Sequence, residues 1–177
     1  MLEVVGSSIW ICEQWSEEVC QFARKERGWT SHMGISSEIL RKITDPEVVV
    51  TFKGNLFLNI GIQNLWALGC ATSAPTACSN AAGRIGVGDS ATAAAATQTG
   101  LQAGSNKTYK AMNSTYPSIS GQTMSFQSDF LTADANYVWN EWTVDNGNPA
   151  QSLNRLVQSL GTKTTGTWTL TAQLTIA

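Results

Sequence analysis

Four carboxylates in the last third of the chain have the spacing that acid–base chemistry could use: Asp129, Asp134, Glu141 and Asp145. A hydrolase acting on cell-wall polymers would need two such groups on one concave face. The alternation of apolar and polar residues instead places Asp129 and Glu141 on the solvent faces of strands. Asp134 and Asp145 lie in sequences typical of turns, where aspartate is common. We therefore expect surface carboxylates and no catalytic pair.

Nucleophilic catalysis and phosphate binding also lack their usual residues. A hydrolytic triad needs a base beside the nucleophile, usually histidine. The single histidine, His32, lies in a charged N-terminal stretch typical of a surface. The segment GRIGVGDS (83–90) has the glycines of a phosphate loop but not its Gly-Lys-Ser/Thr ending. The sequence therefore predicts that the protein has no catalytic residues, is not an enzyme and binds no cofactor.

Metal binding has little support in the sequence. The four cysteines form two pairs, each spaced by eight residues: Cys12 and Cys20, then Cys70 and Cys78. Zinc sites usually use shorter CxxC-type spacing, so we expect free thiols and no metal. A disulfide between Cys70 and Cys78 is the alternative in an oxidising compartment. Asp89, Asp134 and Asp145 could share a calcium ion, but no spaced ligand motif supports it.

Aromatic side chains are the better candidates for contacts with partners. Tyr137 and Trp139 fall on the polar face of an expected strand and could stack on a sugar. We prefer the interpretation that the helix near Trp66 or a neighbouring subunit covers this face. Several further aromatic residues near the N-terminus add more apolar surface than a free segment would expose. The candidate interface anchors are Trp10, Trp15, Phe22, Tyr137 and Trp139.

The elements that position these residues divide the chain into two parts. Residues 1–53 carry 14 of the 24 charged residues. Ser16 can cap a helix that ends near Gly28. Its apolar face consists of Val19, Phe22 and Ala23. Because the composition changes near Asp45-Pro46, we expect a helical arm or extension over residues 1–44, which docks on a partner, and a β-domain over residues 45–177.

The second part reads as a mainly β domain. Val48–Phe52 has the composition of a strand, and apolar residues from Leu58 to Leu68 recur at helical spacing. For residues 90–105 we expect an ordered loop or a single helical turn. From Trp168 to Ile176 apolar residues alternate with threonine or glutamine, which is typical of a half-buried antiparallel strand. The fold class expected is an antiparallel β-sandwich or jelly-roll-like domain with one or two short helices.

The charge and hydropathy of the chain argue against two classes of partner. The net charge is −2, which gives no electrostatic reason to expect binding to nucleic acid or to an acidic membrane surface. Apolar runs are far shorter than the ~20 residues that span a bilayer. We therefore expect neither nucleic acid nor membrane among the partners.

Five segments of the chain resemble small virion proteins of tailed bacteriophages. They are TDPEVVVTFKGNLFLNIGIQNLWALG, GRIGVGDSATAAAATQTGL, YKAMNSTYPSISGQTMSFQSDF, ANYVWNEWTVDNG and LNRLVQSLGTKTTGTWTLTAQLTI. The resemblance covers about three-quarters of the chain, and residues 1–32 lie outside it. These are structural motifs rather than chemical ones, so the resemblance transfers no site residues.

The resemblance implies a capsid decoration (cement) protein that binds and stabilises the assembled head. Its partners would be the major capsid protein and copies of itself, as a homotrimer. The protein would be made in the host cytoplasm and lie on the capsid surface of the virion. The alternative is a tail or fibre component that binds a host-surface glycan or receptor.

Overall fold

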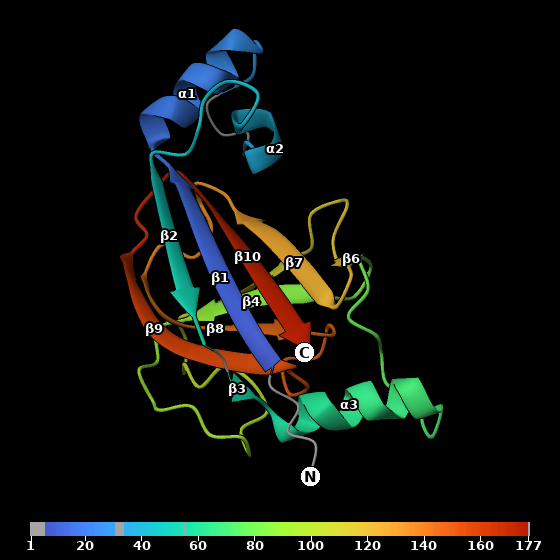
Figure 1. The fold of residues 1–177 in the computed structure, drawn as a ribbon. Coiled ribbons are helices and arrows are strands. Elements are labelled where there is room, and N and C mark those ends of the chain that lie inside the picture. Colours follow the sequence, from blue (N-terminus) through green and yellow to red (C-terminus); the bar gives the residue numbers. More distant parts are fainter. Residues whose placement is uncertain (1–5, 31–33, 55, 177) are drawn as a thin grey trace.

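Two five-stranded antiparallel sheets pack face to face in a computed structural model that describes residues 6–30, 34–54 and 56–176 (Figure 1). The first sheet has the order β2-β1-β10-β7-β6. Its strands are β2 (Val48–Lys53), β1 (Gly6–Trp15), β10 (Thr167–Ile176), β7 (Thr123–Phe130) and β6 (Ser118–Ser120). The second sheet has the order β3-β9-β8-β4-β5. Its strands are β3 (Leu56–Phe57), β9 (Asn154–Thr162), β8 (Val138–Asp145), β4 (Arg84–Gly88) and β5 (Lys107–Ala111). The prediction of a mainly β sandwich is confirmed.

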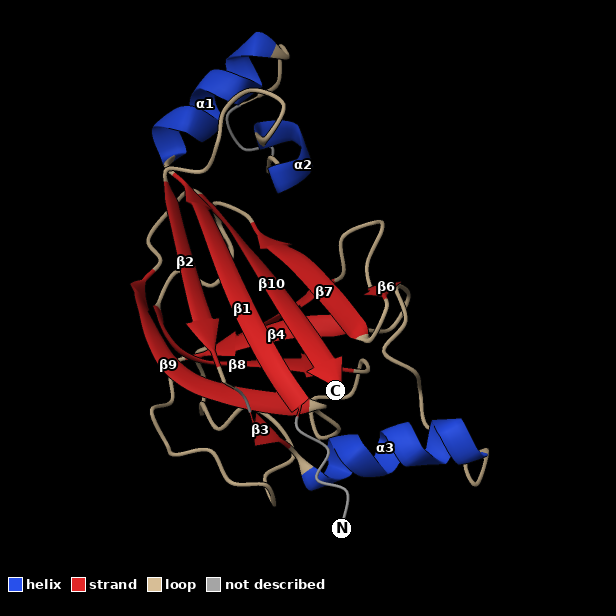
Figure 2. Cartoon of the chain, in the orientation of Figure 1, coloured by secondary structure: helices blue, strands red, loops and turns tan. Residues whose placement is uncertain are grey.

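Three helices lie at the two ends of the sandwich. They are α1 (Glu17–Glu26), α2 (Ser37–Leu40) and α3 (Asn59–Cys70). Figure 2 shows α1 and α2 beyond one end of strands β1 and β2, and α3 at the opposite end. No helix among the described residues has the length and apolar character needed to cross a bilayer.

Aromatic side chains fill the space between the sheets. Trp139 lies between Phe130 and Trp168, with ring centroids 4.7 and 4.9 Å away, and Trp10 lies 6.0 Å from Trp142. Four of the apolar positions expected for the last strand, Trp168, Leu170, Ala172 and Leu174, face this core. Large buried rings supply much of the hydrophobic stabilisation of such a core.

The N-terminal segment corrects the expected arm over residues 1–44. Residues 6–15 form a strand rather than a helical extension, and β1 pairs with β10 along its whole length, from Gly6 opposite Ile176 to Trp15 opposite Thr167. On its other side β1 pairs with β2. The physical reason is the period of two: Trp10 and Cys12 both face the core. The expected boundary at Asp45 therefore cuts through one sheet.

The helix expected after Ser16 is confirmed, and it belongs to the fold. The Ser16 hydroxyl accepts a hydrogen bond from Val19 N at 3.4 Å, and Gly28, with φ of +66°, follows the end of α1. Helices α1 and α2 enclose a second small core formed by Trp15, Cys20, Ala23, Ile35 and Leu40. We call α1, α2 and this core the helical cap.

The helical cap covers the threonine face of β10 at its start. Thr167 Oγ1 donates to Ile35 O at 3.0 Å, and Thr169 Oγ1 donates to a carboxylate oxygen of Asp129 at 2.8 Å. Ser37 N donates to the other oxygen of Asp129 at 2.8 Å. Both threonines are fully buried. At the start of the last strand, the polar face therefore meets groups of the protein itself rather than water.

Candidate functional site

The carboxylates with possible catalytic spacing lie apart, each held by its own partners. Glu141 was expected on a solvent face but is fully buried. Its two oxygens accept hydrogen bonds from the backbone N of Gln102 and Ala103, at 2.9 and 2.7 Å. Arg155, also fully buried, donates from Nε to Glu141 at 2.6 Å. The cause of the burial is the loop of residues 89–106, which folds over the outer face of β8.

The three aspartates also form hydrogen bonds or ion pairs within the chain. Asp129, expected to be exposed, is buried beneath α2 as described above. Asp145 accepts two bonds from Arg84, at 3.0 and 2.7 Å, and one from Gly147 N. Asp134 accepts from Leu131 N at 2.9 Å and pairs with Lys110 at 2.8 Å. Each of the four carboxylates is therefore bound by groups of the chain itself.

Metal-binding chemistry is similarly unsupported in the described part of the chain. It contains no group of three or more histidine, cysteine, aspartate or glutamate side chains that could hold a metal ion. Among the aspartates considered for calcium, Asp89 accepts from the Asn106 amide at 2.8 Å, while the other two pair with cations. His32 lies outside the described residues.

The four cysteine thiols are free, and burial makes three of them, Cys12, Cys20 and Cys78, weak nucleophiles. Cys12 and Cys20 are buried, Cys78 is partly buried and Cys70 is exposed. Burial raises the pKa of the Cys78 thiol to about 11, with the charge of Asp145 adding to the effect. A thiol that holds its proton at neutral pH is a weak nucleophile.

Three of the five expected interface anchors are core residues instead. Trp10, Trp15 and Trp139 are 0–1% exposed, so they stabilise the monomer and reach no partner. For Trp139 the physical reason is an irregularity in the pairing of β8 with β9 between Trp139 and Glu141. Such a bulge shifts the inward and outward phase of a strand. Trp139 and Trp142 therefore both face the core, against the strict alternation that predicted a solvent-facing Trp139.

The other two expected anchors are partly accessible. The Tyr137 hydroxyl donates within the fold, lying 3.2 Å from Val87 O and 2.9 Å from Thr108 Oγ1. Phe22 is 53% exposed on the outer side of α1. Of the predicted set, Phe22 alone presents a large apolar side chain to solvent.

Several large apolar side chains are exposed elsewhere, on α3 and on the edge strand β6. We define the α3 surface as Ile62, Trp66, Leu68 and Ile119. Trp66 is 66% exposed and Ile119 is 75% exposed. An exposed helix normally carries charged residues on its solvent side, yet α3 has neither acidic residues in its first turn nor basic residues in its last. Ile62 and Trp66 are four residues apart and lie on the same side of α3, and an exposed apolar pair of this kind is typical of a site of interaction.

A glycine lets α3 sit close to the sandwich. A Cβ at Gly61 would lie 2.3 Å from the backbone oxygen of Leu153, so no other residue fits there without a shift. The backbone N of Leu58, just before the helix, donates to the same oxygen at 3.1 Å. The helix is thereby fixed at its start, and Leu65 packs on the main core.

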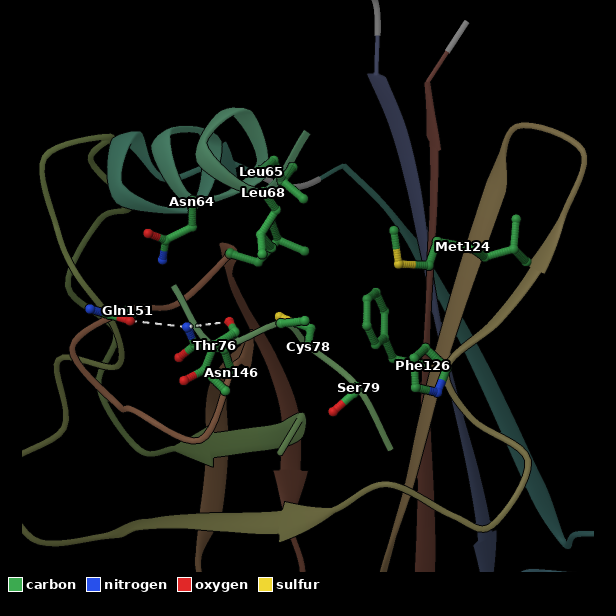
Figure 3. A pocket seen from close by; sticks show the side chains of 15 residues that line it. Asn64, Leu65, Leu68, Thr76, Cys78, Ser79, Met124, Phe126, Asn146 and Gln151 are labelled. Carbon is green, nitrogen blue, oxygen red and sulfur yellow. Dashed lines mark hydrogen bonds between the residues drawn. The ribbon is translucent and has the colours of Figure 1, made fainter. Parts of the chain in front are cut away.

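Beside the α3 surface lies an apolar pocket of about 250 Å³ (Figure 3). Leu65 and Leu68 of α3 form one wall, and Met124 and Phe126 of β7 form another. Cys78 lies between them. Pockets for small-molecule ligands are usually larger, at ~300–1,000 Å³, and contain converging polar groups. This pocket has the size and character to accept an apolar side chain of a protein partner.

Hydrogen bonds hold the rim of the pocket in place. The Asn146 amide donates to Thr76 O at 2.9 Å and to Gln151 Oε1 at 3.0 Å, as Figure 3 shows. The Asn80 amide donates to the carbonyls of Asn113 and Tyr116, at 2.9 and 2.6 Å. These bonds tie the connection after α3 to the sandwich, so the pocket is formed before any partner arrives.

The sequence held one signal of this site that our interpretation did not use. From residue 54 to residue 83 the chain has no charged residue at all. The spacing of apolar residues predicted the helix and its role as a cover for the sheet, but not that Trp66 would point away from the core. A long uncharged segment with an exposed helix is the pattern that could have found the surface.

Comparison with known proteins adds no relative from which a function could be transferred. Neither the family models, nor the curated proteins, nor the solved structures compared with this chain gave a match.

Proposed function

We propose that this chain is a structural protein of a tailed-bacteriophage virion, a decoration protein that binds the major capsid protein on the assembled head. The observation that supports the proposal best is the α3 surface with its adjoining pocket. A protein that works by broad contacts needs an apolar, preformed surface and no reaction centre. Together with the resemblance of five segments to such virion proteins, this surface favours stable attachment to a protein lattice.

The charge distribution supports a protein partner. The two charged side chains between residues 54 and 106 are Arg84 and Asp89, and both bond within the chain. Centres of protein–protein interfaces are depleted of charge and enriched in aromatic residues, which act as hot spots. Trp66 is the aromatic residue in the position of such a hot spot.

The neighbouring loop supports the same proposal by its rigidity. Arg155 donates to Gln98 Oε1 at 2.9 Å and to Thr92 O at 2.8 Å, and so links the loop of residues 89–106 to the buried Glu141. Asn59 N, at the start of α3, donates to Ala96 O in this loop at 2.8 Å. The helix and the loop, in which Asp89 is the one charged residue, therefore form one continuous platform, which would lose little conformational entropy on docking.

Binding to heads that lack this protein tests the proposal. The wild-type chain is expected to co-sediment with assembled heads in stoichiometric amounts, many copies per particle. Trp66→Ala should weaken binding by roughly 30-fold, as expected for a hot spot worth ~2 kcal/mol. Phe22→Ala is the matched control, because it removes a similarly exposed ring from the opposite end of the molecule. A few copies per particle, all at the tail, would contradict the decoration role.

A tail or fibre role in glycan binding is the second candidate, and a polar hollow between α2 and β7 favours it. Asn113, Tyr116 and Gln127 line this hollow together with Glu38 and Arg41. Planar polar side chains beside a tyrosine ring suit a sugar better than Tyr137 and Trp139. Trp139 is buried in the core, and the Tyr137 hydroxyl is hydrogen-bonded within the chain. Glycan arrays would test it: binding that Asn113→Ala abolishes favours this role, and signal at background for the wild-type chain removes it.

The remaining expectations stay predictions of the same proposal. The protein would be made in the host cytoplasm and then join the capsid surface. The homotrimer expected at threefold positions of the lattice would be seen in a reconstruction of the whole particle.

A further inference from the structure

The four edges of the two sheets differ in how well they are protected from pairing with another chain. Unpaired edge strands expose backbone N–H and C=O groups, and proteins usually protect them by keeping the strand short or by adding lysine. Edge strands β3 and β6 have two and three residues. Edge strand β5, Lys107–Ala111, contains Lys107 and Lys110. The remaining edge strand, β2, is the longest of the four, with six residues, and its one lysine, Lys53, is its last residue.

Strand β2 is uncharged over most of its length and accessible to solvent. It has six residues, of which Val48 to Phe52 are uncharged and β-branched or aromatic, the types that favour strands. Val48 is 45% exposed and Val49 is 56% exposed. In the described part of the chain β2 pairs on one side only, with β1. Figure 2 shows the helical cap beyond the start of the strand rather than along its edge.

The ends of β2 carry opposite charges at symmetric positions. Glu47 precedes the strand and Lys53 ends it, so both are three residues from Val50. Because side chains alternate along a strand, Glu47, Val49, Thr51 and Lys53 share one face. In an antiparallel pair of two such strands centred on Val50, each Glu47 lies directly opposite Lys53 of the other copy. Directly opposed residues have Cβ atoms ~4.5–5.5 Å apart, close enough for an ion pair.

We propose that β2 pairs antiparallel with β2 of a second copy of this chain, with Val50 on the twofold axis. The sheet that contains β2 has five strands in each copy, and these two sheets then join into one continuous ten-stranded sheet. Pro46 and Gly54, with φ of +98°, flank the pairing segment and limit it to residues 47–53. A shift by two residues would move each Glu47 away from its lysine. The β-branched and aromatic residues of β2 therefore favour pairing of the two strands, and the charges of Glu47 and Lys53 fix the register of that pairing.

Glu47 can serve this contact without leaving its own. Its carboxylate accepts from Ser16 N at 3.0 Å and from Ser16 Oγ at 2.9 Å, in an exposed position. A carboxylate has about four acceptor sites, so two remain for the lysine of the partner copy. Pairing of seven residues from each copy is a small interface, and we expect a reversible, concentration-dependent dimer.

The mass of the full-length protein in solution, followed by analytical ultracentrifugation, tests the dimer and its register. Lys53→Glu places like charges opposite each other at both ends and should raise the dimer dissociation constant roughly tenfold. Glu47→Lys should do the same, although it also removes the contacts with Ser16. The double variant Glu47→Lys/Lys53→Glu restores opposite charges and should dimerise like the wild type. A monomer at every concentration up to the solubility limit overturns the proposal, as does a trimer that these variants leave unchanged.

Cross-linking gives a second test that does not depend on charge. In a chain carrying Cys70→Ser, which removes the exposed thiol, Val50→Cys brings two thiols face to face across the axis. A short thiol cross-linker should then give a covalent dimer in high yield. Val48→Cys is the matched control, since in this register its two copies lie four residues apart, roughly 13 Å. Equal yields from the two variants would show that the copies do not meet in this register.

The dimer stands independently of the proposed virion role. Neither test uses a capsid, so a monomeric chain that still decorates heads would remove the dimer alone. A dimer that binds no head would remove the decoration role alone.

Discussion

The helical cap and the α3 surface lie at opposite ends of one sandwich. They differ in their content of charged residues and in the burial of their apolar side chains. Residues 17–47, which build the helical cap, contain eleven charged residues, and residues 54–83, which contain α3, have none. At the cap, Arg24 Nη1 pairs with Glu17 at 2.6 Å, and Lys42 with Glu38 at 3.1 Å. Its apolar residues are enclosed in a core of their own. At the other end, Trp66 faces solvent.

This difference shows that a high content of charge and helix in a segment did not predict which part of the chain presents an exposed apolar surface. The charged, helical N-terminal segment suggested a docking arm, yet it completes a sheet and covers the face of β10. The uncharged helix expected to cover a sheet end instead leaves its largest ring outside. Surface charges that find partners within the chain keep the cap soluble and add modest stability. An exposed apolar side chain such as Trp66 contributes hydrophobic stabilisation only when a partner covers it.

Two tryptophan substitutions should separate the two ends most clearly. Trp15→Ala removes a ring that is 1% exposed in the cap core and should lower the free energy of unfolding by about 3–5 kcal/mol. Trp66→Ala removes a ring of the same size from solvent and should change it by less than ~0.5 kcal/mol. Urea unfolding followed by circular dichroism measures both. A larger loss for Trp66→Ala would mean that α3 belongs to the core and would undo the contrast.

The buried pair of Glu141 and Arg155 tests what holds the α3 platform together. Arg155→Met leaves the Glu141 carboxylate with its two backbone donors but no cation, and should cost about 3 kcal/mol in stability. The loop of residues 89–106 should also become sensitive to proteolysis, because Arg155 bonds to two of its residues.

A double variant supplies the control for that pair. Glu141→Gln/Arg155→Met removes both charges and should regain part of the lost stability, since no unpaired charge stays buried. If the double variant is less stable than Arg155→Met alone, the carboxylate is stabilised mainly by the backbone of Gln102 and Ala103. The loop would then be held without the arginine.

The parts of the fold that the sequence predicted correctly are those with local patterns. Ser16 and the charges of the following turn define α1, apolar spacing defines α3, and alternation defines β10. Strand β1 was missed because its partner β10 is about 160 residues away, and pairing at that distance leaves no local signal. The concentration of charge after it favoured a separate arm, although those charges belong to the helices that close over the same sheet.

The site was only partly predictable, for two physical reasons. A shift in the pairing register of β8 and β9 between Trp139 and Glu141 changes which face Trp139 occupies, and the sequence around Trp139 does not predict that shift. The loop of residues 89–106 has almost no apolar periodicity, so the sequence did not indicate that it covers Glu141. Burial of a carboxylate by a distant loop depends on tertiary structure, which local patterns do not encode.

A pH-dependent effect is expected from a buried charge near the cap. Lys163 is fully buried, and its Nζ donates to Leu131 O at 2.9 Å and to Asn136 Oδ1 at 3.0 Å. Burial lowers the pKa of Lys163 to about 8 from its ordinary value of 10.5. Between these two pH values the folded chain has lost this proton and the unfolded chain retains it. Stability contributed by Lys163 therefore rises with pH across this window and is absent below pH 8.

Lys163→Met, which cannot titrate, provides the reference for that effect. The free energy of unfolding of the wild type minus that of the variant should increase as pH rises from 8 towards 10.5. Urea unfolding of both proteins at a series of pH values across this window measures the difference, and groups common to both cancel. A flat difference would show that water or the nearby Asp134 and Glu17 compensate the lysine charge fully. Charges at the cap end would then all be matched within the chain, and the contrast with the α3 surface would be sharper still.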